Sequence, residues 1–292
     1  MNDRQIAFIM CVNDDRQADE SEFYIRCLEV PEQYEVDVIR VREAESMTAG
    51  YNAAMENSDA RYKVYLHQDT RIIAPGFIRD MINVFKNDDT IGMLGCVGCR
   101  KLPANGQAVG HWDAGMVYHN CIPGMLTLEQ DKEQQPVEVE ALDGLLLATS
   151  RDVRWREDLF DGWDFYDVSQ AFEFRRAGYE IVVPYQKEPW VVHDCGFAKL
   201  TNYDRNRKIC MEEYPEFLNA PEEMELISND EWNCLSSQLA KEIRKMLDRG
   251  KWSEAERVLQ IYHQKQMKSS ELEMLGIICE IEQAERKAGV TH

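Results

Sequence analysis

The chain has 292 residues, of which 44% are apolar and 29% charged, a usage typical of a folded globular protein rather than a disordered or fibrous one. Acidic residues outnumber basic ones by 53 to 33, so the formal net charge is -20. This charge disfavours nucleic acid and anionic membrane surfaces as partners. An anionic ligand such as a nucleotide would then need a local cation or a divalent metal ion.

The first part of the chain alternates predicted strands and helices. The continuous apolar run 6–12 predicts a buried strand that ends in polar turn residues, and a second strand is expected at 34–41. Apolar residues at helical spacing predict helices over 22–28 and 48–57, and a third strand follows at 62–66. This alternation indicates a parallel sheet with right-handed crossovers, whose ligands bind at the carboxyl ends of the strands.

The remainder of this α/β domain is less regular. A helix is expected over 75–85, with Pro75 in its first turn. The glycine-rich stretch 91–125 is expected to hold one strand and a loop-rich insertion. The remaining predicted elements are a helix over 169–177 and strands over 136–142, 145–148, 179–183 and 190–192.

Targeting segments and disulfides are not expected. The run 6–12 is too short for a signal peptide or a membrane span, and no other stretch approaches about twenty apolar residues, so a cytoplasmic protein without a membrane span is predicted. The 9 cysteines are scattered. Cys96 and Cys99 form a CxxC pair without a partner pair at zinc-ligand spacing, which favours buried apolar cysteines over a metal or redox site.

The pattern changes to amphipathic helix from residue 219 onward. A boundary near residue 220 is therefore predicted, with an α/β domain over 1–219 and a small all-α domain over 220–292. Segment 250–255 resembles the turn of a tetratricopeptide repeat, but a single copy favours a helical hairpin or cap packed on the main domain or a partner. The expected apolar face of the first helix comprises Trp232, Leu235, Leu239, Ile243 and Met246.

Two pairs of residues mark the helices that follow. Ser253 with Glu256 forms a capping box for the next helix, after Gly250 has ended the first one. Ser270 with Glu273 marks a third helix.

Three polar residues next to predicted elements could carry chemistry. Asp69 follows the third strand, where a carboxylate suits a hard divalent cation that bridges a diphosphate, although a turn or a cap is the commoner role. Asp167 stands at the entrance of the helix 169–177 and could accept a proton from a hydroxyl nucleophile, or serve as an ordinary cap. His193 follows an apolar strand and could complete the coordination of a borderline metal such as manganese, or be structural.

The order and spacing of these segments resemble the family 2 inverting glycosyltransferases of GT-A fold, and more closely the bacterial glycosyltransferase-like branch named after a streptomycin biosynthesis protein. The resemblance runs from Ile6 to about Tyr203. It implies a mixed, mainly parallel sheet flanked by helices. The motifs that carry it are a first strand ending in Asn13 and the segments 49–52, 66–69, 142–144 and 160–167, the last leading into 175–179.

The resemblance also implies a role for each matching residue. Asp69 matches the metal-binding aspartate, His193 a histidine that often adds a metal contact, and Asp167 the catalytic base. His67 replaces the first aspartate of the metal motif, and Tyr166 replaces an acidic residue common just before the base. The residues that match the nucleotide-sugar site are Asn13, Asp14, Asn52, His67, Gln68, Asp143 and Gly144.

These roles predict transfer of a sugar from a nucleotide-sugar donor, with UDP-sugars favoured, to a hydroxyl of a glycan or small-molecule acceptor. Asp167 would deprotonate the acceptor while Mn or Mg, held by Asp69 and His193, neutralises the leaving diphosphate. Inversion at the anomeric carbon is implied by the resemblance. Two alternatives stay open: a catalytically silent nucleotide-sugar or glycan binding protein, which the change at His67 favours, and a scaffold that binds a protein partner or a second copy through its C-terminal helices.

Overall fold

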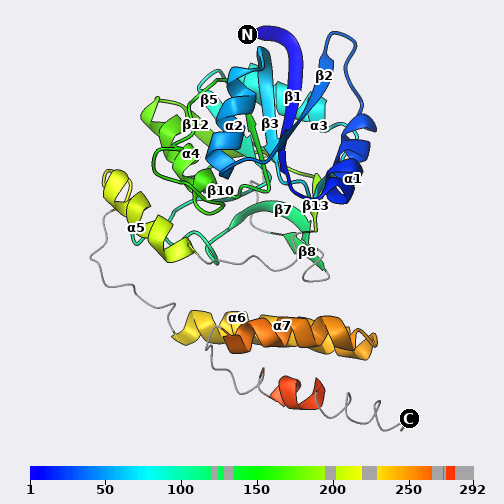
Figure 1. Ribbon diagram of the computed structural model, residues 1–292. Coiled ribbons are helices and arrows are strands. Elements are labelled where there is room, and N and C mark those ends of the chain that lie inside the picture. Colours follow the sequence, from blue (N-terminus) through cyan, green and yellow to red (C-terminus); the bar gives the residue numbers. More distant parts are fainter. Residues whose placement is uncertain are drawn as a thin grey trace. The chain divides into compact units, whose positions relative to one another are not determined.

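A computed structural model describes residues 1–119, 124–127, 134–194, 202–218, 229–264, 272 and 274–279, without the side chains of 119, 124–127, 229–237 and 260–264. The chain divides into two compact units, Met1–Glu222 and Glu223–His292, whose elements are labelled in Figure 1. The predicted boundary at residue 220 lies outside the described residues and stays a prediction.

The first unit alternates strands and helices and then becomes strand-rich. Its first elements are β1 (Asn2–Val12), α1 (Asp15–Arg26), β2 (Glu35–Arg42), α2 (Met47–Glu56), β3 (Ala60–Leu66), β4 (Thr70–Ile72) and α3 (Phe77–Asn87). They are followed by the short strands β5 (Ile91–Gly95), β6 (Val97–Cys99), β7 (Ala114–His119), β8 (Gly124–Thr127), β9 (Val137–Glu138), β10 (Ala141–Leu142) and β11 (Leu146–Thr149). The last are α4 (Tyr166–Arg176), β12 (Glu180–Val183), β13 (Val191–His193) and α5 (Tyr203–Glu213).

These strands form two sheets. Among the described residues, the larger has seven strands in the order β2-β1-β3-β11-β5-β12-β9, and the smaller has the order β10-β6-β7-β13-β4, with β8 beside β7. The α/β class with a mixed sheet is confirmed. Parallel pairs are β1–β2, β1–β3 and β5–β12. The other three pairs of the larger sheet are antiparallel, two because β11 enters between β3 and β5 in the opposite direction and the third because β9 runs opposite to β12. The sheet is thus evenly mixed rather than mainly parallel.

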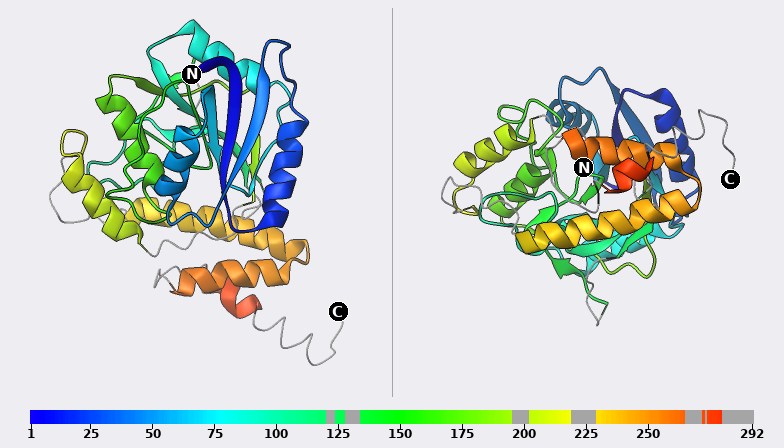
Figure 2. Two further views of the ribbon diagram at one scale, coloured as in Figure 1. Left: turned by 45° about the horizontal axis from the view of Figure 1, so that its top comes forward. Right: turned by 90° about the horizontal axis from the view of Figure 1, so that it is seen from below.

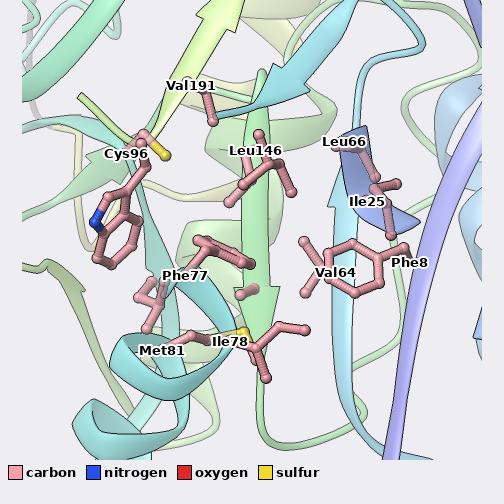
Figure 3. Packing of buried hydrophobic residues seen from close by; sticks show 14 of the residues in the cluster. Phe8, Ile25, Val64, Leu66, Phe77, Ile78, Met81, Cys96, Leu146 and Val191 are labelled. Atoms are coloured by element: carbon pink, nitrogen blue, oxygen red, sulfur yellow. The ribbon is translucent and has the colours of Figure 1, made fainter. Parts of the chain in front are cut away.

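Helices cover both faces of the larger sheet, as the left view of Figure 2 shows. Successive residues of a strand point to opposite faces, and β1 follows this rule. Phe8 packs in one core with Ile25 of α1 and Phe77 of α3 (Figure 3), whereas Ile9 packs in a second core with Tyr51 of α2 and with α4. Burial on both faces explains why residues 6–12 read as a continuous apolar run.

Several element boundaries differ from the prediction. α1 begins at Asp15 rather than at residue 22, because its first turns are polar and carry no apolar periodicity. α3 begins after Gly76, so Pro75 is not in its first turn. α4 begins at Tyr166, which places Asp167 inside the first turn instead of ahead of it.

The stretch 91–125 and the segment after β13 also differ from the prediction. The glycine-rich stretch contains β5, β6, β7 and the start of β8 instead of a single strand. α5 was not predicted, because its sequence is mostly charged.

The second unit contains α6 (Asn229–Asp248) and α7 (Trp252–Gln264), with further helical residues at 274–279. Leu239, Ile243 and Met246 are buried in a core of this unit together with residues of α7 and of 272–279. These three residues therefore pack within the helical unit itself, and cover of the stripe by the main domain or a partner stays a prediction. Trp232, Leu235, Ser270 and Glu273 lie outside the described side chains or residues.

The turn between α6 and α7 also corrects one expectation. α7 begins at Trp252, ahead of Ser253, so Ser253 lies within the first turn and is not its cap. Gly250 has a φ of 73°, which is left-handed and favours glycine at the end of a helix.

Two further observations on the described residues concern the CxxC cysteines and the apolar character of the helices. Cys96 and Cys99 are free and buried. No helix in the part of the chain that the structure describes has the length and apolar character to cross a bilayer.

Candidate active site

A cleft of about 290 Å³ opens where the carboxyl ends of β1, β2 and β3 meet. This is the edge at which ligands of such sheets bind. Among the described residues that line the cleft, Glu43 and Asp69 carry carboxylates and none is a lysine or arginine. The lining residues are Cys11, Val12, Asn13, Glu43, Ala44, Met47, His67, Gln68, Asp69 and Trp163.

Gln68 joins the ends of two neighbouring strands at the floor of this cleft. Its Oε1 accepts hydrogen bonds from the backbone N–H groups of Asn13 at 2.9 Å and Asp14 at 3.0 Å, and its Nε2 donates to Asn13 Oδ1. Asp14 caps α1 by accepting from the backbone of Arg16 and Gln17. The Gln68 side chain therefore ties the end of β1 to the β3–β4 turn.

The smaller sheet brings His193 to this edge although it is far from Asp69 in sequence. β4 starts directly after Asp69, and β13 pairs with β4 so that His193 stands opposite Thr70. The backbone N–H of Asp194 donates to the Asp69 carbonyl at 2.9 Å. The pairing of β4 with β13 thus places the Asp69 carboxylate beside the His193 imidazole.

Three potential metal ligands converge here: one donor atom each of His67, Asp69 and His193 lies within 4.8 Å of the other two. His193 Nε2 is 3.4 Å from Asp69 Oδ1, and His67 Nδ1 is 3.2 Å from His193 Nε2 and 3.9 Å from Asp69 Oδ1. Asp69 Oδ1 is buried and has no hydrogen-bond partner. A buried carboxylate oxygen without a donor is costly, so the donor set fits a cation.

The two imidazoles influence the charge of Asp69. Burial acts to raise the pKa of Asp69, but the close approach of His193 and the positive charge that either imidazole can carry outweigh it and lower that pKa. Burial and the neighbouring His193 lower the pKa of His67. The cluster therefore favours an ionised carboxylate beside a neutral His67, which is the protonation state that metal binding requires.

The other nitrogen of His67 is occupied. His67 Nε2 forms a hydrogen bond with the hydroxyl of Tyr166, a residue that is 3% exposed. Tyr166 packs on Tyr51, with ring centroids 6.0 Å apart. Gly144 makes room for that hydroxyl, since a Cβ built there would lie 2.0 Å from it. The rotation of the His67 ring is thus held by a buried phenol.

Asp167 directly follows Tyr166 in the sequence, and its environment differs from that of Asp69. Its Oδ2 accepts from the backbone N–H of Gly144 and its Oδ1 from that of Val168, both at 2.9 Å. Burial, followed by repulsion from Asp143, raises the pKa of Asp167 to about 7. A carboxylate with this pKa is suited to accept a proton near neutral pH.

The backbone just before Asp167 is strained. Phe165 has a φ of 66° and is 3% exposed, and this left-handed conformation is an outlier for a bulky residue. It ends the loop that carries Trp163, which is 52% exposed at the cleft. Such strain clusters at functional sites, where the surrounding structure enforces it.

The predicted site residues fall into three groups. Asn13, His67, Gln68 and Asp69 line the cleft, and His193 joins them through Asp69. Asp143 and Gly144 lie with Asp167, and none of these three is among the lining residues.

Two further residues of the predicted nucleotide-sugar site have other uses. Asp14 caps α1. Asn52 is 2% exposed, and both ends of its amide bond the backbone of Trp155, each at 2.9 Å. We therefore leave Asn52 out of the site proposed below.

Sequence reasoning missed two lining residues that deserve a role. Glu43 directly follows β2 and has a φ of 54°, so its place after a parallel strand at the ligand edge was the available signal. Trp163 lies inside the motif 160–167, but nothing in its pattern distinguishes a cleft residue from a core residue.

The comparisons with known proteins give one family and several distant structures. Residues 7–214 match the family described as Glycosyltransferase like family. No protein of curated function matches this chain significantly.

The three solved structures named here are all below 13% identical to this chain. The chain is similar to the crystal structure of S. aureus TarS 1-349 in complex with UDP (11% identity, TM-score 0.48, covering 75% of this chain and 67% of that chain). It is also similar to the mannosyltransferase PcManGT from Pyrobaculum calidifontis in complex with GDP-Man and Mn2+ (12% identity, TM-score 0.46, covering 93% of this chain and 78% of that chain). A third similar structure is that of GalNAc-T7 with UDP, GalNAc and Mn2+ (12% identity, TM-score 0.48, covering 79% of this chain and 53% of that chain).

The family match covers most of the first unit, including the whole edge formed by β1, β3 and β13. It spans more than half of the 292 residues, and the chain therefore belongs to this glycosyltransferase-like family.

Proposed function

We propose that this protein transfers a sugar from a nucleotide-sugar donor to an acceptor hydroxyl with the help of a divalent metal ion, as an inverting enzyme of the GT-A type. The closer resemblance to the streptomycin-related branch is part of this proposal. The observation that carries it is Asp69 Oδ1, a buried oxygen without a hydrogen-bond partner at the cleft, 3.4 Å from His193 Nε2. Asp69 and His193 would hold the ion.

The charge of the cleft supports a metal requirement. A donor diphosphate is anionic, and the described lining offers Glu43 and Asp69 but no basic side chain. The ion, when bound, would neutralise the diphosphate and stabilise it as a leaving group. Asn13 and Gln68 would form the floor under the nucleotide, and Trp163 offers an exposed aromatic ring at the cleft.

Asp167 would act as the base. The acceptor oxygen forms a bond to the anomeric carbon, the bond from that carbon to the diphosphate breaks, and the hydroxyl proton passes to Asp167. The N–H groups of Gly144 and Val168 orient the carboxylate. Direct displacement by one nucleophile inverts the anomeric centre, and UDP-sugars are the first donors to test because the resemblance favours them.

Thermal unfolding in the presence of nucleoside diphosphates tests the binding step. UDP, GDP or TDP with Mn²⁺ should raise the melting temperature, and excess chelator should abolish the rise, because a ligand that binds only the folded state stabilises it. Equally tight binding in chelator would refute the metal requirement.

Product analysis tests the transfer step. Incubation with a stabilising donor and a panel of hydroxyl acceptors should yield product with inverted configuration, or slow donor hydrolysis. A metal-dependent rise in melting temperature without turnover of any donor would favour the catalytically silent binding protein. Deletion of residues 221–292 distinguishes the enzyme proposal from the scaffold hypothesis. Sugar transfer should survive the deletion if the first unit is the enzyme.

A further inference from the structure

We infer that His67 is a metal ligand oriented by Tyr166, and that the site therefore prefers borderline transition-metal ions to Mg²⁺. The inference rests on the proposed metal-dependent transfer and extends it to the identity of the ion. It concerns two residues that contact each other, His67 and Tyr166.

The first argument is the position of the donor atoms. Ligands that share one ion at about 2.1 Å lie roughly 3.0 to 3.4 Å apart. The separation of His67 Nδ1 from His193 Nε2 is 3.2 Å, and that of His193 Nε2 from Asp69 Oδ1 is 3.4 Å. The remaining pair, His67 Nδ1 and Asp69 Oδ1, is 3.9 Å apart. A small rotation of one ring would complete the set.

The second argument is the contact between His67 and Tyr166. Metal-bound histidines almost always donate their second ring N–H to an oxygen, which fixes the ring. Here the second nitrogen, Nε2 of His67, meets the hydroxyl of Tyr166. An imidazole at position 67 thus has the partner it needs at position 166, and Gly144 provides the space for that partner.

The third argument is the chemistry of the donors. Oxygen ligands suit Mg²⁺, whereas imidazole nitrogens suit later first-row ions. Two imidazoles and one carboxylate form a set typical of sites for such ions, with positions left open for other ligands. We therefore expect affinity to rise from Mg²⁺ through Mn²⁺ to Co²⁺.

Titration of the nucleotide-free protein with Co²⁺, Mn²⁺ and Mg²⁺, followed by calorimetry and by the visible absorption of Co²⁺, tests the inference. Wild type should bind Co²⁺ at least about ten times more tightly than Mg²⁺. His67→Asp should reduce that ratio and shift the Co²⁺ spectrum. Tyr166→Phe, which removes only the hydroxyl, should weaken Co²⁺ binding by about 10- to 100-fold.

Matched controls separate ligation from folding. His111→Gln and Tyr179→Phe alter a histidine and a tyrosine outside the cluster and should leave Co²⁺ binding unchanged, and thermal unfolding of all variants reports whether they fold. Absence of Co²⁺ binding, equal affinities for Co²⁺ and Mg²⁺, or an unchanged spectrum in a folded His67→Asp variant would overturn the inference.

Failure of the inference is distinguishable from failure of the proposed function. If Co²⁺ binds as expected but no donor is turned over, the transfer proposal fails and the ligand assignment stands. If wild type and His67→Asp transfer sugar equally well with Mg²⁺ and bind Co²⁺ alike, the enzyme proposal stands and the assignment of His67 fails.

Discussion

Asp69 and Asp167 are both partly buried carboxylates of the same unit, yet their surroundings change their pKa values in opposite directions. Asp69 has two imidazoles beside it, and its pKa is lowered. Burial, followed by repulsion from the carboxylate of Asp143, raises the pKa of Asp167 to about 7. Opposite shifts of neighbouring groups indicate a division of roles. The comparison supports the proposal that Asp69 binds the cation and that Asp167 accepts the proton.

The largest expected effect is that of Asp69→Asn. Loss of the charged ligand should remove the metal contribution, which we place at about 4 kcal/mol or three powers of ten in transfer rate. Mn²⁺-dependent stabilisation by nucleotide should disappear with it. Rates and melting curves should be measured beside Asp89→Asn, an exposed control. An Asp69→Asn variant that keeps the metal-dependent shift would contradict the assignment.

Asp167→Asn should come next. Removal of the base should lower transfer by about two to four powers of ten, while metal and nucleotide binding persist. Asn has the size of Asp and keeps an oxygen that can accept from the backbone N–H groups of Gly144 and Val168. Asp164→Asn is the matched control, because burial also raises the pKa of that carboxyl. If Asp164→Asn loses activity and Asp167→Asn does not, the base lies at Asp164.

The pH profile should show the raised pKa of Asp167. A base must be ionised, so kcat/KM should fall about tenfold per pH unit below pH 7 and level off above it. The titratable groups that interact electrostatically with Asp167 include Asp143, Tyr51, Tyr166, Tyr203 and Cys210. A profile that is flat between pH 5 and 7 is the contrary result.

The same shift has a consequence for stability with a defined sign. The pKa of Asp167 is higher in the folded state than its usual value of 3.8, so ionisation disfavours folding. Stability from this group is complete below about pH 4 and is lost as the pH rises to about 7. The melting temperature of Asp167→Asn relative to wild type should therefore rise over this window, and a constant difference would argue against the shift.

Gly144→Ala should have the smallest effect, since it changes neither Asp69 nor Asp167 and alters only the position of Tyr166. The added Cβ would meet the Tyr166 hydroxyl, and overpacking of this kind costs about 1–3 kcal/mol. Chemical denaturation measures this cost. Gly110→Ala is a control for the substitution, because nothing lies within 4 Å of a Cβ there, although its φ of 88° adds backbone strain of its own.

Much of the fold could be predicted because its strands are buried on both faces. The runs that became β1 and β3 are continuous and apolar, and polar residues follow them at the ligand edge. Prediction failed where packing rather than pattern decides the structure. β4 has three residues, and its pairing with β13 depends on contacts over more than one hundred residues.

The site was predictable as a set of residues but not as an arrangement. Asp69 and His193 could be named from motifs, whereas the contact of His67 with Tyr166 could not, because residues 99 apart give no local signal. Asn52 illustrates the opposite case. It lies in a motif segment, yet its amide is used to hold the backbone of Trp155.

The bridge formed by Gln68 has a further consequence. Because its side chain already saturates the amides of Asn13 and Asp14, the two strand ends are ordered before any ligand arrives. The entropy lost in fixing this floor belongs to folding and not to association, so a nucleotide would meet a preorganised surface. We expect amide hydrogen exchange of Asn13 and Asp14 to be slow in the free protein and little changed by ligand.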